Sequence, residues 1–125
     1  MFTVEDVIMD ITFLCPKHTE WVYSHPEQAV HFLARDEYQG SMLYADGQYR
    51  EAIAYLGCAF DIAAILLEVD GGDNDAMRLK LESLGDLLSD AYNKLGLVHY
   101  KSAIEIRAAG LLSTMPYYNV AVLHA

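Results

Sequence analysis

The segment 48–69 constrains the fold most, because it is apolar on nearly every side of the helix that it predicts. Apolar side chains recur at helical spacing on two faces: Ile53, Leu56, Phe60 and Ala63 on one, and Tyr55, Ile62, Leu66 and Val69 on another. A helix with this pattern must be covered by neighbours on more than one side. Asp61 and Glu68 interrupt the apolar run, so a buried core helix explains it better than a membrane span.

Capping and breaking residues place another helix before this one. A Ser-His-Pro-Glu sequence at 24–27 predicts a helix start, with Ser24 able to cap the first turn. Apolar residues then recur at about the helical period until the Asp-Gly pair at 46–47 breaks the pattern. The sequence therefore predicts a helix over 26–45 that packs against the next helix along the chain.

Two more helices are predicted beyond a loop rich in glycine and aspartate at 70–75. A clean apolar stripe with charged residues on the opposite side predicts a helix over 76–95. Gly96 ends that helix, and a further one is expected over 97–112. No segment alternates apolar and polar residues as a strand does, so the expected fold is all-α.

The two ends of the chain carry signals of their own. Apolar residues at helical spacing predict a short first helix over 3–14, which Pro16 ends. At the other end, 113–116 marks another start, and 117–123 forms either a final short helix or an extended tail. The whole chain, 1–125, is expected to form one compact domain of five to six helices.

The charge of the chain excludes some classes of partner. Eighteen acidic residues against eight basic ones give a formal net charge of −10. Such a surface repels phosphate backbones and anionic lipid heads, so we expect neither nucleic acid nor a membrane as partner. A basic protein or peptide segment would be attracted instead, and its association should weaken as salt is raised.

The N-terminus and the cysteines indicate a cytoplasmic protein. Glu5, Asp6 and Asp10 stand where a signal peptide needs basic residues ahead of an apolar stretch. Cys15 and Cys58 are the only cysteines, which is too few for a disulfide framework. They are expected to remain thiols in a reducing compartment.

Small and large apolar residues beyond residue 39 follow a spacing that can be compared with a known family. The positions are Gly40, Leu43, Gly47, Tyr49, Ala52, Leu56 and Ala59. This spacing resembles a tetratricopeptide repeat at about 33–66, and a degenerate second copy follows at about 84–117. The small residues let two antiparallel helices approach closely, while the large ones fill the space between them. The first copy departs from the family at Asp36, where an aromatic residue is usual, and the second at Lys94 and Arg107.

The resemblance implies antiparallel helical hairpins that bind another protein, without catalysis and without a cofactor. In that family the first helix of each hairpin lines the binding face, which places Tyr38, Tyr44 and Tyr92 at the expected partner site. Tyrosine combines an apolar body with a polar tip, which suits partner contact. We therefore expect a chaperone-like or adaptor-like module that holds a partner segment through these three tyrosines.

Two alternatives remain open. The apolar fraction of 54% favours self-association, which would make the protein an obligate homodimer. Cys15, His18, His25 and His31 form the one cluster of soft ligands, and a metal-binding or small-ligand-binding protein would use them. Their spacing does not match a zinc finger, so no metal ligand is assigned. Cys58 lies mid-helix among apolar residues, where burial should raise the pKa of its thiol and leave it unreactive.

Overall fold

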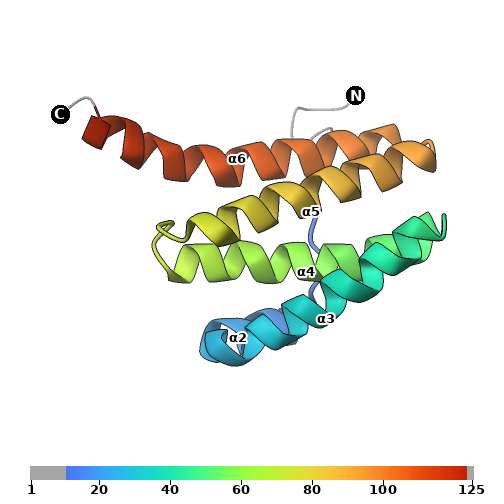
Figure 1. The fold of residues 1–125 in the computed structure, drawn as a ribbon, viewed down its shortest axis with the longest axis horizontal. Coiled ribbons are helices and arrows are strands. Elements are labelled where there is room, and N and C mark those ends of the chain that lie inside the picture. Colours follow the sequence, from blue (N-terminus) through green and yellow to red (C-terminus); the bar gives the residue numbers. More distant parts are fainter. Residues whose placement is uncertain (1–10, 124–125) are drawn as a thin grey trace, which may run out of the picture.

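Residues 11–123 fold into successive antiparallel helices, with no strand in this part of the chain (Figure 1). In this computed structural model the backbone is described for residues 11–123 and the side chains for residues 11–113. Within that part of the chain the helices are α2 (Pro16–Ser24), α3 (Pro26–Ala45), α4 (Tyr49–Val69), α5 (Asp75–Lys94) and α6 (Val98–Leu123). The all-α class predicted from the sequence is confirmed.

The four long helices lie side by side in chain order, from α3 to α6 (Figure 1). Each packs mainly against the helix before it and the helix after it, whereas the short α2 packs against α4 and α3. Residues 11–15, which precede α2, cross this row beside α4 (Figure 1). A row of this kind covers its middle helices on more sides than the helices at its ends.

The turns between helices lie where glycines and capping residues predicted them. Gly47 has a φ of 77°, a left-handed conformation that glycine adopts at little cost, and it closes the turn from α3 to α4. Asn74 caps α5, because its side-chain oxygen accepts a hydrogen bond of 3.0 Å from the backbone N–H of Met77. The predicted limits of α3, α4 and α5 are confirmed to within one residue.

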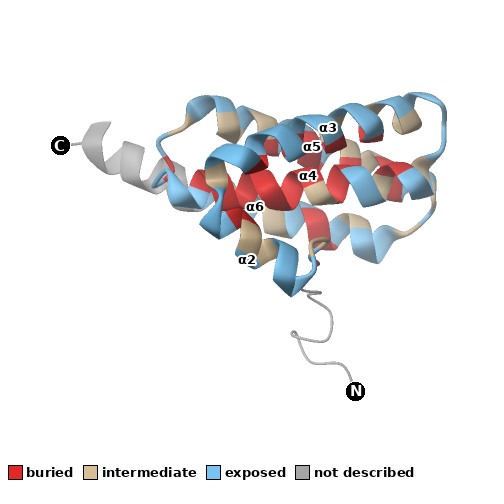
Figure 2. Ribbon diagram, turned by 90° about the horizontal axis from the view of Figure 1, so that it is seen from below, coloured by how far each residue is buried: buried red, intermediate tan, exposed pale blue. Residues whose placement is uncertain are grey.

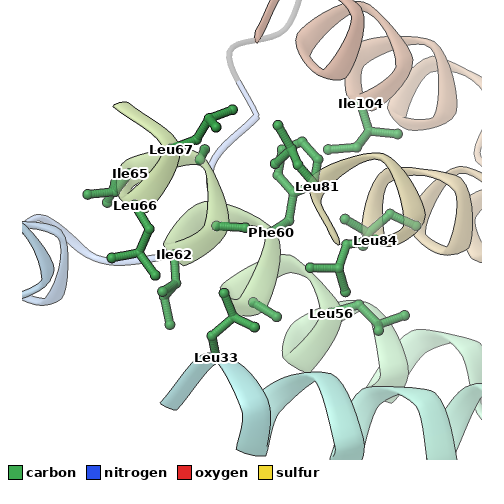
Figure 3. Packing of buried hydrophobic residues seen from close by; sticks show 14 of the residues in the cluster. Leu33, Leu56, Phe60, Ile62, Ile65, Leu66, Leu67, Leu81, Leu84 and Ile104 are labelled. Carbon is green, nitrogen blue, oxygen red and sulfur yellow. The ribbon is translucent and has the colours of Figure 1, made fainter. Parts of the chain in front are cut away.

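Helix α4 forms the centre of the core, as its all-round apolar pattern predicted (Figure 2). Every residue of 59–67 is buried. Phe60 points from α4 toward Leu81 of α5 and Ile104 of α6, and all three side chains are fully buried (Figure 3). Burying one such side chain contributes roughly 1.5–3 kcal/mol, so this contact links three of the helices strongly.

The same helix is, within the described residues, the one segment long and apolar enough to span a membrane by length and composition. Its mean hydropathy over the most apolar window is 1.9. However, 72% of that window is buried inside the bundle. The core helix of a bundle meets the same criteria, and packing against α3 and α5 accounts for the apolar character of α4.

Helices α3 and α4 approach closely at Gly40. A Cβ added to Gly40 would lie 2.7 Å from Cγ of Leu56, so a larger residue would force the helices apart. Ala52 and Ala59, one turn to either side of Leu56 on α4, are also fully buried. The predicted close contact through small residues is confirmed for this hairpin.

The N-terminal region differs from the prediction. The helix predicted over 3–14 lies mostly outside the described residues, and its described part, 11–14, is not helical. The first described helix begins at Pro16, where we expected a helix to stop. Proline suits the first turn because its missing N–H would have no helical partner there. In addition, Cys15 Sγ accepts a hydrogen bond of 3.4 Å from the backbone N–H of His18.

The prediction that Ser24 caps α3 is also wrong. The Ser24 hydroxyl donates to the backbone oxygen of Glu20 at 3.0 Å and so takes part in the end of α2. His25 holds the cap position of α3 and makes no side-chain capping bond. The proline at the helix start was predicted correctly, since Pro26 is the first residue of α3.

The C-terminal helix is longer than predicted. Helix α6 continues to Leu123 and does not end at Leu112. The new start expected at 113–116 is therefore wrong. Serine often ends helices because its hydroxyl competes for backbone groups, but the Ser113 hydroxyl donates to the backbone oxygen of Gly110 within the helix, at 3.0 Å.

Candidate functional site

A pocket of about 670 Å³ opens between α2, α3 and α4. This volume lies within the range of about 300–1,000 Å³ that is typical of ligand sites. The pocket is lined mainly by apolar and aromatic side chains, together with a few polar ones. The lining residues are Leu14, His18, Trp21, Val22, Phe32, Arg35, Asp36, Ala54, Tyr55, Cys58 and Ile62.

The pocket exists because α4 is uncovered along part of one side. Residues 59–67 are buried all round, whereas Ala54 and Tyr55 lie on an exposed side of the preceding turns. Ala54, Cys58 and Ile62 are spaced four residues apart, so they share one face of α4 and line the pocket along that helix. The small side chains of Ala54 and Cys58 leave the space that larger residues would fill.

Aromatic contacts join α2 and α3, which line the pocket together with α4. The ring of Trp21 from α2 meets the ring of Phe32 from α3 edge-on, with centroids 5.3 Å apart. Trp21 also stacks with His25, with ring centroids 5.0 Å apart. Phe32 is 40% exposed and Tyr55 is 41% exposed, so apolar surface continues from the pocket to the outside.

Asp36 is a buried acidic group among the lining residues. It lies on the core side of α3 and is only 7% exposed. Burial raises the pKa of its carboxyl group above the ordinary value, and the neighbouring Arg35 guanidinium opposes this effect. The Asp36 carboxyl is therefore easier to protonate than an ordinary aspartate.

The Cys58 thiol lies beside the same space. Cys58 is half-buried, and burial is the main cause that raises the pKa of its thiol. The nearby carboxylates of Asp36 and Asp61 raise that pKa further, because a thiolate would be repelled by them. The predicted direction is confirmed, and a protonated thiol of this kind is a poor nucleophile.

A second polar cluster holds the N-terminal segment to the bundle. Asp61 Oδ2 accepts the backbone N–H of Phe13 at 2.6 Å and of Leu14 at 2.8 Å. Arg107 of α6 donates to Asp61 Oδ1 at 2.5 Å and to the backbone oxygen of Ile11 at 3.0 Å. This cluster explains why Arg107 stands where the repeat pattern expects an apolar residue. Since its groups satisfy one another, its role is structural.

The predicted partner-binding tyrosines lie in different environments. Tyr38 is 67% exposed on the outside of α3. The Tyr44 hydroxyl donates a hydrogen bond to Asp90 of α5, which raises the pKa of Tyr44 to about 12. Tyr92 is only 6% exposed and stacks on Tyr100 at 5.5 Å. The structure therefore does not bring the three tyrosines together on one surface.

The four soft ligands of the sequence are not gathered into one site either. Cys15 caps α2, His18 lines the pocket, and His25 stacks on Trp21. His31 is exposed on α3. Within the part of the chain that the structure describes, no group of three or more His, Cys, Asp or Glu side chains is arranged to hold a metal ion.

The residues that build the pocket were not predicted from the sequence, although the pattern of α3 contained one indication of them. Ala29, Leu33, Asp36 and Gly40 are the buried residues of α3 and follow one helical stripe. An aspartate in a stripe of core positions is unusual, because burial of a carboxylate is costly. This placement could have indicated a special role for Asp36. Trp21 carried no comparable signal, because the segment around it showed no clear period.

Comparisons with protein-family models, with curated proteins and with solved structures give no match to this chain. The class of this protein is given by its fold. It is an all-α bundle of successive antiparallel helices, and an apolar pocket with a buried aspartate lies on one of its sides.

Proposed function

We propose that this protein is a non-catalytic interaction module and that its pocket receives side chains from a segment of a partner protein. The observation that carries the proposal is the pocket itself, an apolar hollow of about 670 Å³ whose aromatic rim residues Phe32 and Tyr55 remain about 40% exposed. Exposed aromatic surface around a hollow is typical of interaction sites, where buried anchors supply most of the binding energy.

We also propose that the two hairpins, α3–α4 and α5–α6, are repeats of the tetratricopeptide type. The close approach at Gly40 and the burial of Ala52, Leu56 and Ala59 support this for the first hairpin. In the second hairpin, the small residue Ala91 is fully buried at the place equivalent to Gly40. In repeats of this kind, function lies in the exposed surface and not in the architecture.

Of the three predicted contact tyrosines, Tyr38 has the exposure that a partner contact requires. Tyr44 links α3 to α5 through its bond to Asp90, and Tyr92 links α5 to α6 through its stack on Tyr100. We therefore retain Tyr38 as a partner contact on the exposed side of α3. We assign Tyr44 to joining the two hairpins and Tyr92 to joining the two helices of the second hairpin.

The charge of the chain suits a basic partner. The formal net charge of −10 accelerates the approach of a basic segment and disfavours acidic competitors. The apolar and aromatic contacts supply most of the affinity, and raising salt should weaken binding mainly by slowing association. Free thiols at Cys15 and Cys58 agree with a cytoplasmic location, which we also propose.

The experiment that tests the proposal compares two substitutions that add the same large side chain. Ala54→Trp fills the pocket from the exposed side of α4, while Ala109→Trp places the same bulk on an exposed position of α6. Each variant and the unchanged protein are used to capture partners from native lysate. We expect a specific partner that the unchanged protein and Ala109→Trp retain and that Ala54→Trp loses.

Retention of the same partner by Ala54→Trp would show that binding does not use the pocket. Thermal unfolding of both variants must accompany the capture, because loss of binding through misfolding would lower Tm as well. An Ala54→Trp variant that keeps its Tm and loses the partner supports the proposal.

Self-association is a second candidate, and one observation favours it. Helix α6 packs mainly against α5, and its Val98 and Ile106 are more than half exposed. They are eight residues apart and so share a face that a second copy would cover. Mass determination in solution decides this, since Ile106→Glu should convert a dimer of this kind to a monomer.

A further inference from the structure

The carboxylate of Asp36 is poorly satisfied within the pocket. Only 10% of its side chain is exposed, so water gives it little solvation. Among residues 11–113, its single hydrogen-bond partner is Arg35 Nη2, which lies 3.5 Å from Asp36 Oδ1. Buried carboxylates ordinarily accept several hydrogen bonds or face a close cation, and a shortage of such partners costs free energy.

Arg35 does not supply the close cation that the Asp36 carboxylate lacks. Its side chain is 66% exposed, and its guanidinium lies over the ring of Phe32, 4.7 Å from the centroid. A separation of 3.5 Å is longer than an ordinary hydrogen bond between charged groups. Asp36 Oδ2 receives no hydrogen bond from the described side chains, although Asp36 lines the pocket.

The walls around Asp36 suit a particular kind of group. Trp21, Phe32 and Tyr55 present aromatic surface, which attracts cations as well as apolar atoms. The contact between Arg35 and Phe32 shows that a guanidinium is already accommodated on one of these rings. Leu14, Val22 and Ile62 complete an apolar lining that an aliphatic or aromatic stem would fill.

We infer that the pocket binds a cationic group, an ammonium or guanidinium on an apolar stem, with Asp36 as its counter-ion. The inference rests on the proposed function and makes it more specific, since the occupant is then a lysine or arginine side chain of the partner segment. Among the described residues that line the pocket, Arg35 is the cation that lies against Asp36. Arg35 therefore competes with the occupant for Asp36.

The test uses two small probes with similar bodies and opposite charges, phenethylamine and 3-phenylpropionate. Their binding to the ¹⁵N-labelled protein is measured by chemical-shift titration at neutral pH and low salt. We expect phenethylamine to bind at least fivefold more tightly, with shifts centred on residues that line the pocket. Equal binding of the two probes, or shifts elsewhere, would overturn the inference.

Two variants connect this preference to Asp36. Asp36→Asn should reduce the preference for the amine to less than twofold, whereas the control Glu82→Gln removes one exposed charge from α5 and should leave it unchanged. Arg35→Met should strengthen amine binding severalfold, because the competing cation is gone. A loss of amine binding in Arg35→Met, or an unchanged preference in Asp36→Asn, would contradict the inference.

A pair of peptides separates the partner side chain from a free amine. One apolar peptide carries a single lysine, and the other carries norleucine at the same position. If the occupant is a side chain of a partner segment, the lysine peptide should bind more tightly than both the norleucine peptide and phenethylamine. Asp36→Asn should then bind the lysine and norleucine peptides equally. The Ala54→Trp capture tests the proposed function independently, because it detects use of the pocket whatever the charge of the occupant.

Discussion

The ring of Phe13 lies so close to Gly57 that no Cβ could be added to Gly57 without moving one of them. Phe13 belongs to the non-helical segment before α2, and Gly57 lies in the middle of α4. Glycine inside a helix normally costs about 1 kcal/mol relative to alanine. At this position glycine permits a contact between two parts of the chain that are far apart in sequence.

This contact predicts that Gly57→Ala destabilises the protein even though alanine is the better helix former. Overpacking of a tight contact typically costs about 1–3 kcal/mol, which should exceed the gain in helix propensity. Gly110→Ala is the matched control, because a Cβ there meets nothing within 4 Å and should stabilise α6 by up to about 1 kcal/mol. Urea unfolding measures both. A stabilised Gly57→Ala variant would show that the segment simply moves away.

A second prediction concerns the pair formed by Arg107 and Asp61. Arg107→Met should lower the free energy of unfolding by about 3–5 kcal/mol, because it leaves the Asp61 carboxylate buried without its cation. The exposed pair of Lys101 and Glu105 provides the control, and Lys101→Met should cost less than about 1 kcal/mol. Similar losses in both variants, measured by urea unfolding, would show that the Arg107 pair has no special importance.

A third prediction concerns alkaline pH. The bond to Asp90 raises the pKa of Tyr44 to about 12, from an ordinary value of 10.0. A raised pKa means that the stabilisation is fully present below pH 10 and is lost as the pH rises toward 12. Tyr44→Phe should therefore lower Tm at neutral pH and make Tm less dependent on pH above 10. Tyr38→Phe, at an exposed position, should change neither; an equal effect of the two would contradict the prediction.

A fourth prediction concerns the stability of Asp36→Asn. Burial raises the pKa of the Asp36 carboxyl, so folding favours its protonated form. Its stabilisation is present below the unfolded value of 3.8 and is lost as the pH rises through the raised value. Asp36→Asn should therefore be at least as stable as the unchanged protein at neutral pH. A clear drop in Tm would show that the Asp36 charge is well compensated in the fold, which would weaken the case for a cationic occupant.

Sequence patterns predicted the parts of the fold that depend on local spacing. Helices α3, α4 and α5 begin and end near the predicted residues because caps, glycines and apolar periodicity are local signals. The close approach at Gly40 was also predictable, since a repeat pattern relates residues within one hairpin. These signals determine the hairpins and their order.

Contacts between distant parts of the chain could not be predicted in this way. Asp61 accepts hydrogen bonds from Phe13 and Leu14, which are more than 45 residues away, and no spacing rule relates them. The non-helical segment 11–15 is held in place by those bonds and not by a helix propensity of its own. The pocket depends on the same contacts, because they fix where α2 lies against α4.

The hydrogen bond from Arg107 to the backbone oxygen of Ile11 joins residues 96 positions apart. In an open row of helices, each helix meets only its neighbours, so unfolding can start at one end and stop partway. Here the start of the described chain is fastened to the last helix across the central one. Helix α6 cannot separate without also releasing the segment that leads into α2. These contacts connect the first and the last described parts of the bundle. We therefore expect both hairpins to unfold together, in one cooperative transition.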